Sequence, residues 1–337
     1  MRVTEEPLLR KFWYCIMPMA DLKDKPVGAR LLGVGVVIWK DEDGQPCAAR
    51  DRCLHRTARL SLGHIERGNI VCPYHGWEYN KSGQCVKVPQ NLVEKPTPFA
   101  IESYHCAARY GYVWIALEDP IYGIPEIPES GMPGYRQVDE FCDDWECAPL
   151  RIMENAFDNA HFAFVHKNSF GDPNPIPPPF TLEDTDDGFI MRTEIPVRNP
   201  VGMREALNIA DERTVRRSAN RYFLPFFRVG KITYPNGLVN MLCTAATPMA
   251  ESRTRFVQWV IRNDTEEQVP AARVIAFDKR VSEEDRAVLE STDDDVPLDK
   301  SEGRELHMHG DRPGMLMRKK LRRLIRPNPP PPLQGGQ

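Results

Sequence analysis

The sequence predicts an α+β protein with an N-terminal antiparallel β domain and a C-terminal domain that combines an antiparallel sheet with helices. The prediction rests on short β-type runs up to about residue 120, a change to helical and then longer strand-like runs beyond it, and a length of 337 residues. A chain of this length exceeds the size at which single cores stop growing. We therefore expect domains at 1–120 and 121–326, followed by a proline-rich, disordered tail at 327–337.

The N-terminal domain is expected to be built from short strands. LLGVGVVIWK, CAARDRC and YGYVWIAL have the composition of β-strands and are separated by polar turn residues. NKSG at 80–83 lies between WEY and QCVKV and predicts a β-hairpin. Loops at the ends of such strands are suitable places for metal ligands.

The C-terminal domain is expected to begin after the proline-rich linker DPIYGIPEIPES. A helix is predicted at about 151–167, followed by strands at FIMRTEIPV, RYFLPFF, LVNMLCTAAT and RFVQWVIR. A second, strongly periodic helix covers 271–292, and RKKLRRLIR predicts a docked terminal helix with a cationic outer face. That cationic face is a candidate site for recruiting an acidic electron-transfer partner. The strands RYFLPFF and LVNMLC are expected to fill the core rather than line a pocket.

Composition and charge describe an ordinary globular chain. Hydrophobic residues make up 41% of the sequence, charged residues 27%, and the formal net charge is -4, which excludes a general attraction to nucleic acid. The stretch MRVTEEPLLRKFWYCIMPMADL has early acidic residues and no clean apolar core, so it predicts neither a secretory signal nor a membrane span. The nine cysteines are odd in number, which favours reduced thiols. We expect a cytoplasmic protein without membrane contact.

Two mixed cysteine and histidine pairs form the first metal motif. Cys53 and His55 are followed, after sixteen intervening residues, by Cys72 and His75. One tetrahedral zinc could use all four side chains. The alternation of Cys and His within each loop instead favours a two-iron, two-sulfide cluster, with the cysteines on one iron and the histidines on the other. Trp77 directly follows the second pair and is expected to shield the cluster.

A second metal motif lies in MENAFDNAHFAFVH. Asp158, His161 and His166 follow the pattern D-x2-H-x4-H. On a helix, Asp158 and His161 would share a face, whereas His166 would lie about 140 degrees away, so both imidazoles reach one metal only if the helix ends or bulges between them. Two imidazoles and one carboxylate form the facial triad that leaves coordination positions open on ferrous iron. Asn155, one turn before Asp158, is expected to face the same pocket.

The carboxylate of this triad is expected from the helix at 271–292. An apolar stripe with one acid inside it follows steps of three and four residues: Val274, Phe277, Val281, Asp285 and Val288. Burying an unpaired carboxylate is unfavourable, and a metal removes that penalty. Asp285 is therefore the predicted third ligand, with Glu284 and Asp278 as alternatives and a simple solvated acidic face as the plain interpretation.

These motifs carry a resemblance to a known family. Residues Cys53 to Trp77 resemble the Rieske iron-sulfur family, and the E-x3-D-x2-H-x4-H motif from Glu154 to His166 together with the EDR-x-V-L-E segment at Asp285 extends the resemblance to Rieske non-haem iron oxygenases. The length is similar to that of the small oxygenases with α-subunits only. These include vanillate and dicamba O-demethylases, caffeine N-demethylase and saxitoxin-pathway hydroxylases.

The resemblance implies a cluster domain joined to a helix-grip catalytic domain, and a ring-shaped homotrimer. It also implies that His75, Asp158 and His161 form a bridge between the cluster of one subunit and the mononuclear iron of the next, which makes Asp158 a candidate catalytic residue. Asn155 is a further candidate because of its spacing of one helical turn from Asp158. The implied function is the terminal oxygenase component, which uses O2 to hydroxylate or to O- or N-demethylate a small organic substrate.

Electrons for this chemistry are expected to come from NAD(P)H through a ferredoxin or a flavin-dependent reductase. The chain has no G-x-G-x-x-G dinucleotide motif and no plant-type ferredoxin cysteine set, so these electrons must arrive from partner proteins. The alternatives are a Rieske electron-transfer protein without oxygen chemistry and a zinc-stabilised binding module.

Overall fold

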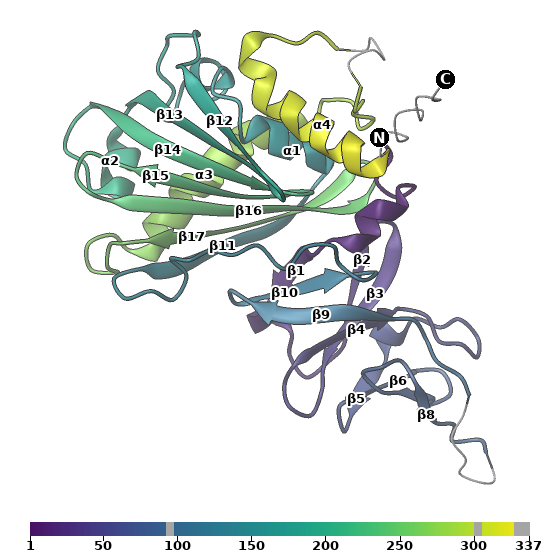
Figure 1. Cartoon of the computed structure of the whole chain (residues 1–337). Helices are drawn as coiled ribbons and strands as arrows, with labels where there is room; N and C mark the ends of the chain where they lie inside the picture. Colours follow the sequence, from purple (N-terminus) through teal and green to yellow (C-terminus); the bar gives the residue numbers. More distant parts are fainter. Residues whose placement is uncertain (92–97, 300–304, 327–337) are drawn as a thin grey trace, which may run out of the picture.

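The computed structural model describes residues 1–91, 98–299 and 305–326 of the chain. A small β domain lies beside a larger domain that contains one long sheet and the α-helices (Figure 1). The expected α+β class is confirmed. The expected disordered tail at 327–337 lies outside the described residues, and the domain boundary at 120/121 stays a prediction.

The small domain contains two antiparallel sheets. The larger has the order β1-β10-β9-β4-β3-β2, formed by Tyr14–Pro18, Tyr112–Ala116, Ser103–Arg109, Pro46–Arg50, Val34–Lys40 and Val27–Leu31. The smaller has the order β5-β6-β7-β8, formed by His64–Glu66, Asn69–Val71, Glu78–Tyr79 and Cys85–Lys87. The hairpin expected at 80–83 joins β7 to β8. Short 3-10 helices occur at Pro7–Lys11, Met19–Asp21 and Leu60–Leu62.

The large domain is built on a seven-stranded antiparallel sheet with the order β11-β17-β16-β15-β14-β13-β12. Its strands are Arg136–Trp145, Arg253–Arg262, Val239–Ala250, Phe227–Thr233, Arg213–Phe223, Gly188–Arg198 and Phe180–Thr185, respectively. RYFLPFF, expected to be one strand, instead contains the end of β14, a turn and the start of β15. Because β14 and β15 pair with each other across this turn, the apolar run reverses direction rather than continuing.

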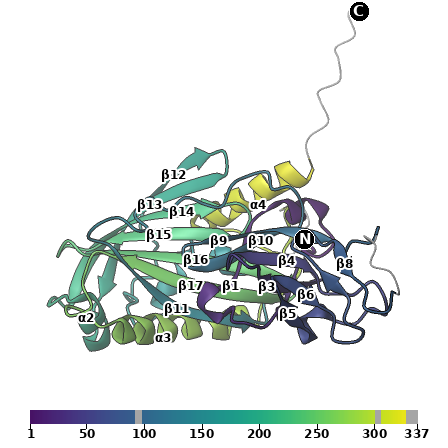
Figure 2. The same ribbon diagram turned by 90° about the horizontal axis from the view of Figure 1, so that it is seen from below.

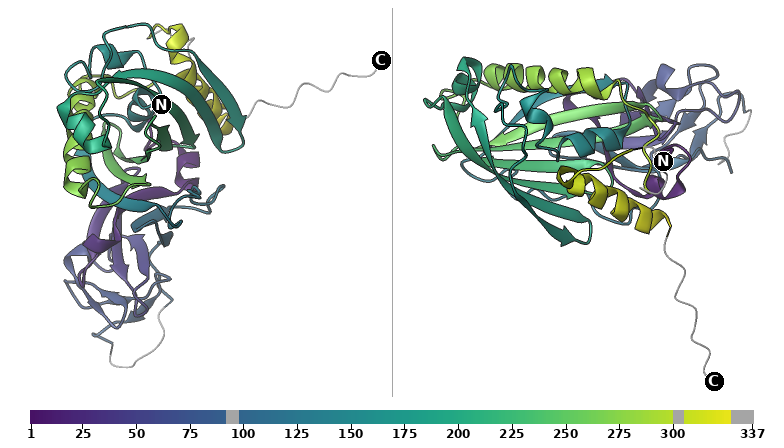
Figure 3. Two further views of the ribbon diagram at one scale, coloured as in Figure 1. Left: turned by 90° about the vertical axis from the view of Figure 1, so that its left-hand side faces the viewer. Right: turned by 90° about the horizontal axis from the view of Figure 1, so that it is seen from above.

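In the described parts of the chain, four α-helices accompany the sheet: α1 (Pro149–Asn155), α2 (Val201–Leu207), α3 (Ala271–Leu289) and α4 (Arg312–Ile325). Figure 2 shows α3 running along one face of the sheet, and Figure 3 shows the sheet curving around α1 and α3. Helix α4 packs beside β13 and α1, as the predicted docking of a terminal helix requires. Single 3-10 turns lie at His161–Ala163 and His309–Asp311.

One expectation about helices is wrong, and a second holds only in part. The helix expected at 151–167 ends at Asn155. The side chain of Asp158 accepts hydrogen bonds from the backbone N–H groups of Ala160 (2.7 Å) and His161 (3.2 Å), and this local turn competes with helix continuation. In α4, Arg318 does not belong to the cationic outer face, because its guanidinium is buried and donates to the Glu154 carboxylate at 2.5 and 2.8 Å.

The two domains share one apolar core. A single cluster joins Leu9 and Ile115 of the small domain to Met153 and Phe157 of the large one. The N-terminal amino group also donates to Asp295 at 2.8 Å, so the first residue is tied to the large domain. The relative placement of the two domains is therefore stabilised by buried apolar surface.

Within the described residues, no helix combines the length and the apolar character needed to span a membrane. No disulfide joins any of the nine cysteines. The cytoplasmic location expected from the sequence stays a prediction.

Candidate metal centres

The two cysteine-histidine loops share one backbone pattern. The N–H of Cys53 donates to the carbonyl of Ala58, and the N–H of Cys72 donates to the carbonyl of Trp77, each at 2.8 Å and each spanning five residues. Four residues after each cysteine, Thr57 and Gly76 adopt positive φ angles of 58° and 70°. This matched loop pair, which the sequence reasoning missed, brings the two cysteines to equivalent positions.

The two cysteine side chains of these loops are buried, and the two histidine side chains are more exposed. Cys53 and Cys72 are 1% and 2% exposed, whereas His55 is exposed and His75 is half-buried. The two imidazole rings lie 4.4 Å apart, measured between centroids. Trp77 stacks on His55 at 5.1 Å with an interplanar angle of 7°. The thiols therefore face the interior and the imidazoles face the tip of the domain.

This arrangement fits an iron-sulfur cluster. Burial raises the pKa of the Cys72 thiol, so a thiolate at this position requires a compensating cation. The Nδ1 atom of His75 is buried and has no hydrogen-bond partner among the described residues. Tyr79, which the sequence reasoning also missed, places its hydroxyl 3.3 Å from Sγ of Cys53. Buried thiols and outer imidazoles match a cluster with cysteines on one iron and histidines on the other.

The second group of candidate ligands comes from two distant segments. His161 lies in the 3-10 turn His161–Ala163, His166 follows in the next loop, and Asp285 projects from α3. The Nε2 atoms of the two histidines lie 3.2 Å apart, and Oδ1 of Asp285 lies 3.5 Å and 3.2 Å from them. One ligand atom from each residue falls within 4.8 Å of the others. Two nitrogens and one carboxylate oxygen that converge in this way fit a facial triad for iron.

Each imidazole ring is oriented by a carboxylate at its Nδ1 atom, on the ring edge opposite the Nε2 atom that faces Asp285. His161 Nδ1 lies 3.1 Å from Oδ2 of Asp158, and His166 Nδ1 lies 2.8 Å from Oε2 of Glu284. Ser169 donates from its hydroxyl to the same Glu284 oxygen at 2.7 Å. Carboxylates at Nδ1 hold the rings so that Nε2 faces a metal.

The pKa values of His166 and Asp158 at this site are shifted by their hydrogen-bonding neighbours. Burial alone would lower the pKa of His166, but hydrogen bonds to Asp285 and Glu284 outweigh it and raise the pKa. Burial alone would raise the pKa of Asp158, but the hydrogen bond with His161 outweighs it and lowers the pKa. Asn155 donates from Nδ2 to Oδ1 of Asp285 at 3.2 Å, so its side chain lies beside the three candidate ligands.

The buried face of helix α3 does not coincide with the predicted apolar stripe. Its buried positions are Val274, Asp278, Ser282 and Leu289, whereas Val288 is 47% exposed. Of the alternative acids, Asp278 hydrogen-bonds to Glu140 and is not among the three converging ligands, and Glu284 contacts Nδ1 of His166. The expected apolar stripe at Val288 is therefore wrong, because the contacts of α3 with the sheet rotate its buried face by one residue at that end.

A cavity of about 130 Å³ lies beside the triad, between the seven-stranded sheet and α3. His161, His166 and Asp285 form part of its wall. The cavity lies where a small molecule would contact a metal held by the triad.

Comparisons with known proteins decide the family. Residues 12–104 match the family model of the Rieske [2Fe-2S] domain, and residues 145–327 match that of the vanillate O-demethylase oxygenase C-terminal domain. The chain belongs to the Rieske oxygenase family. This oxygenase therefore carries a [2Fe-2S] cluster and a mononuclear iron, and it is an oxygenase component rather than the electron carrier or zinc module considered above.

Individual relatives agree with this assignment. The oxygenase is 30% identical to methylxanthine N1-demethylase NdmA of Pseudomonas putida, a match that covers 95% of this chain and 90% of the relative. Methylxanthine N3-demethylase NdmB of the same organism is 28% identical over 85% of this chain and 82% of its own. The function expected for a terminal oxygenase component is confirmed.

Solved structures share the fold. NdmA with caffeine superimposes with a TM-score of 0.81 at 27% identity, covering 94% of this chain and 91% of the other. Dicamba monooxygenase bound to 3,6-dichlorosalicylic acid gives a TM-score of 0.81 at 22% identity, covering 94% and 97%, and supports the fold alone. The oxygenase therefore has the two-domain architecture of these enzymes.

Proposed function

We propose that this oxygenase demethylates or hydroxylates a small organic substrate at an iron held by His161, His166 and Asp285. The convergence of these three ligand atoms within 4.8 Å carries the proposal. The names of two relatives that match most of the chain, both methylxanthine demethylases, support demethylation as the reaction. The cavity beside the triad supports a substrate of small size.

Each residue around the triad has a defined part in this proposal. Asp158 and Glu284 hold the two imidazole rings, and Asn155 holds the Asp285 carboxylate by its hydrogen bond to Oδ1. When bound, ferrous iron supplies open coordination positions for oxygen chemistry. The protein supplies fixed ligand orientation and a cavity that limits access of water.

The cluster is assigned to the two loops at the tip of the small domain. Cys53 and Cys72 would hold the inner iron, and His55 and His75 the outer one, with Trp77 covering one imidazole face. A cluster of this type stores one electron at a time. The exposed histidine end is the side from which electrons would leave.

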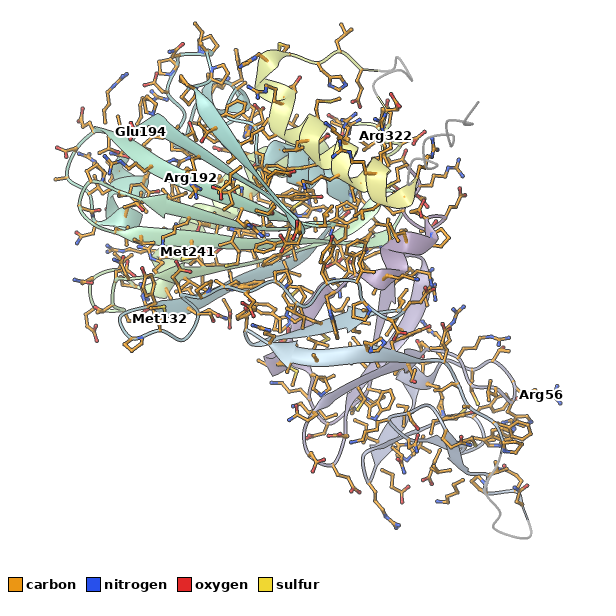
Figure 4. All side chains as sticks on the ribbon, viewed as in Figure 1. Arg56, Met132, Arg192, Glu194, Met241 and Arg322 are labelled. Atoms are coloured by element: carbon orange, nitrogen blue, oxygen red, sulfur yellow. The ribbon has the colours of Figure 1, made fainter. Side chains whose placement is uncertain are left out.

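Electron transfer between subunits of a homotrimer is the second part of the proposal. Arg56, next to His55, lies at the end of the small domain remote from the seven-stranded sheet (Figure 4). A cluster at this tip would deliver electrons most directly to the iron of a neighbouring chain. Asp158, whose side chain is 30% exposed, would connect His75 of the neighbouring subunit to His161.

External partners complete the system. A ferredoxin or a flavin-dependent NAD(P)H reductase would reduce the cluster, because a [2Fe-2S] cluster and a mononuclear iron accept electrons but do not bind NAD(P)H.

Sedimentation velocity of the metal-loaded protein tests the homotrimer. A monomer at micromolar concentration would contradict electron transfer between subunits.

Metal analysis tests the iron assignment. Anaerobically purified protein is compared with His161→Ala and with the control His105→Ala, whose exposed imidazole pairs with Asp119 in the small domain. Wild type and control should contain about three iron atoms and two sulfides per chain, whereas His161→Ala should lose one iron and keep its red-brown colour. Full iron retention in His161→Ala would contradict the proposed ligand set.

A further inference from the structure

The sheet face that contacts the cavity is unusually polar. Opposite faces of the central strands differ: one carries the apolar cluster that contains Phe227, Met241 and Trp259, and the other carries Arg216, Asn220, Arg228 and Asn240 toward α3. Arg216 and Asn240 are only 7% and 4% exposed. Long polar side chains are rarely buried unless they are paired or bind a ligand.

Several polar atoms in this wall lack partners. Nε of Arg216, Nε of Arg228, Oδ1 of Asn220 and Oδ1 of Asn240 are buried without a hydrogen bond among the described residues. All four residues line the cavity that also contains His161, His166 and Asp285. Leaving buried polar groups without partners is unfavourable, so their concentration in one cavity indicates a polar ligand.

The two guanidinium groups are held in place but not neutralised. Arg216 lies over the ring of Phe170 at 4.6 Å and that of Phe162 at 5.6 Å. Arg228 donates from Nη1 to the carbonyl of Ala156 at 2.8 Å, and burial lowers its pKa to about 10. Neither forms an ion pair with any described residue. Buried cations of this kind require a negative partner.

The neighbouring carboxylates provide only part of that charge. Asp278 lies against Glu140, and burial together with the Asp278 charge raises the pKa of Glu140, so the pair holds one proton between them. Arg262, which also faces this pair, is already paired with Asp264. The charge of Asp285 also acts on Arg228, but Asp285 is the proposed iron ligand, so its charge serves the metal. Apart from Asp285, one negative charge faces the two guanidinium groups of Arg216 and Arg228, and a positive charge is left over.

We propose that the cavity binds an anionic substrate, a small organic acid whose carboxylate contacts Arg216 while its apolar part extends toward His161, His166 and Asp285. Arg228 contributes to the positive potential and also ties the end of α1 to the sheet. Arg216 is the specificity-determining residue, because its remaining contacts are the side chains of Phe162, Phe170 and Tyr234 rather than backbone. This inference rests on the proposed iron site, since it places the substrate beside it.

Equilibrium binding to the iron-loaded protein tests the proposal without requiring the true substrate. The probes are benzoate, phenylacetate and 3-phenylpropionate, each compared with its neutral primary amide by anaerobic isothermal titration calorimetry. At least one acid should bind about tenfold or more tightly than its amide, because only the acid carries the negative charge that forms an ion pair with Arg216.

Three variants assign that preference to Arg216. Arg216→Gln should raise the dissociation constant of the acid about tenfold or more and leave that of the amide unchanged. Arg216→Lys, which keeps the charge, should retain part of the preference and guards against a folding defect. Arg217→Gln is the matched control, because Arg217 lies on the same strand, is exposed and pairs with Glu194. It should bind like wild type.

The outcomes separate this inference from the proposed function. Equal binding of acid and amide, unchanged acid binding in a folded Arg216→Gln protein, or no binding of any acid would each overturn the anion site. Iron analysis of the same samples reports on the triad independently. Protein with full mononuclear iron and no preference for acids would contradict only the anion site, whereas protein that cannot hold this iron would contradict the proposed function.

Discussion

Nδ1 of His166 lies 2.8 Å from Oε2 of Glu284, which turns the Nε2 atom of that ring toward Asp285. Glu284 and Asp285 are adjacent on α3, yet one orients a histidine from behind and the other faces the same histidine from the front. The side chains of neighbouring helix positions diverge by about 100 degrees, and His166 fits into the angle between them. Adjacent acids in the sequence therefore have different parts in one site.

Glu284→Gln is expected to weaken iron binding. The amide cannot replace the negative charge that supports His166, so the iron dissociation constant should rise about tenfold to a hundredfold. Ferrous iron titration of metal-depleted protein measures the change. Glu283→Gln is the control, because Glu283 is on the opposite side and pairs with Lys279 and Arg286. Equal affinities for the two variants would remove Glu284 from the site.

Asp158→Asn is expected to keep both metals and lose electron transfer. The amide preserves size but not the charge that couples to His161, so reoxidation of the reduced cluster by oxygen and substrate should slow about tenfold or more. Stopped-flow absorbance of the cluster measures the rate. Asp186→Asn, an exposed acid elsewhere in the same domain, should behave as wild type. Undiminished reoxidation in Asp158→Asn would refute its assigned part.

Arg318→Met is expected to destabilise the protein by about 1 to 3 kcal/mol, because two half-buried carboxylates lose their buried partner and keep only Arg151. Arg318 donates to Glu154 and pairs with Glu305 at 2.7 Å, with only 3% of its side chain exposed. Urea unfolding followed by tryptophan fluorescence measures the change. Lys319→Met alters the next, exposed residue and should change stability little. A similar loss in both variants would argue against a specific effect of the buried ion pair.

Asp144→Asn is expected to reduce stability in a pH-dependent way. Burial would raise the pKa of Asp144, but hydrogen bonds from Arg255 and Arg253 outweigh it and lower the pKa below the ordinary 3.8. A lowered carboxyl pKa stabilises the fold above the ordinary value, and this contribution is lost as pH falls through the folded-state pKa.

The difference between wild type and Asp144→Asn should therefore be about 1 kcal/mol and constant between about pH 5 and 7, and it should shrink below about pH 4. Denaturant unfolding at several pH values measures it, with Asp43→Asn as an exposed control. A difference in stability that grew on acidification would contradict the inferred lowering of the Asp144 pKa.

Local patterns predicted much of the architecture. Apolar runs identified several strands, among them β3, β4 and β10 of the small domain and β13, β16 and β17 of the large one. The turn at 80–83 was also confirmed, because such features depend on nearest neighbours along the chain. The helix at 151–167 was wrong for a related reason. Helical periodicity continued past Asn155, but the Asp158 side chain bonded to the backbone of Ala160 and His161 and ended it.

The sequence by itself determined which residue types could bind metals, because cysteine, histidine and carboxylate at short, defined spacings restrict coordination chemistry. It also indicated Asp285, 119 residues beyond His166, which the structure brings within 3.2 Å of that histidine. Only the tertiary structure decided that Glu284 supports a ligand, that Arg318 is buried, and that Arg216 and Arg228 face the same cavity as the triad. Such contacts join strands and helices far apart in the chain, and their geometry depends on the curvature of the sheet and the rotation of α3, which no local pattern encodes.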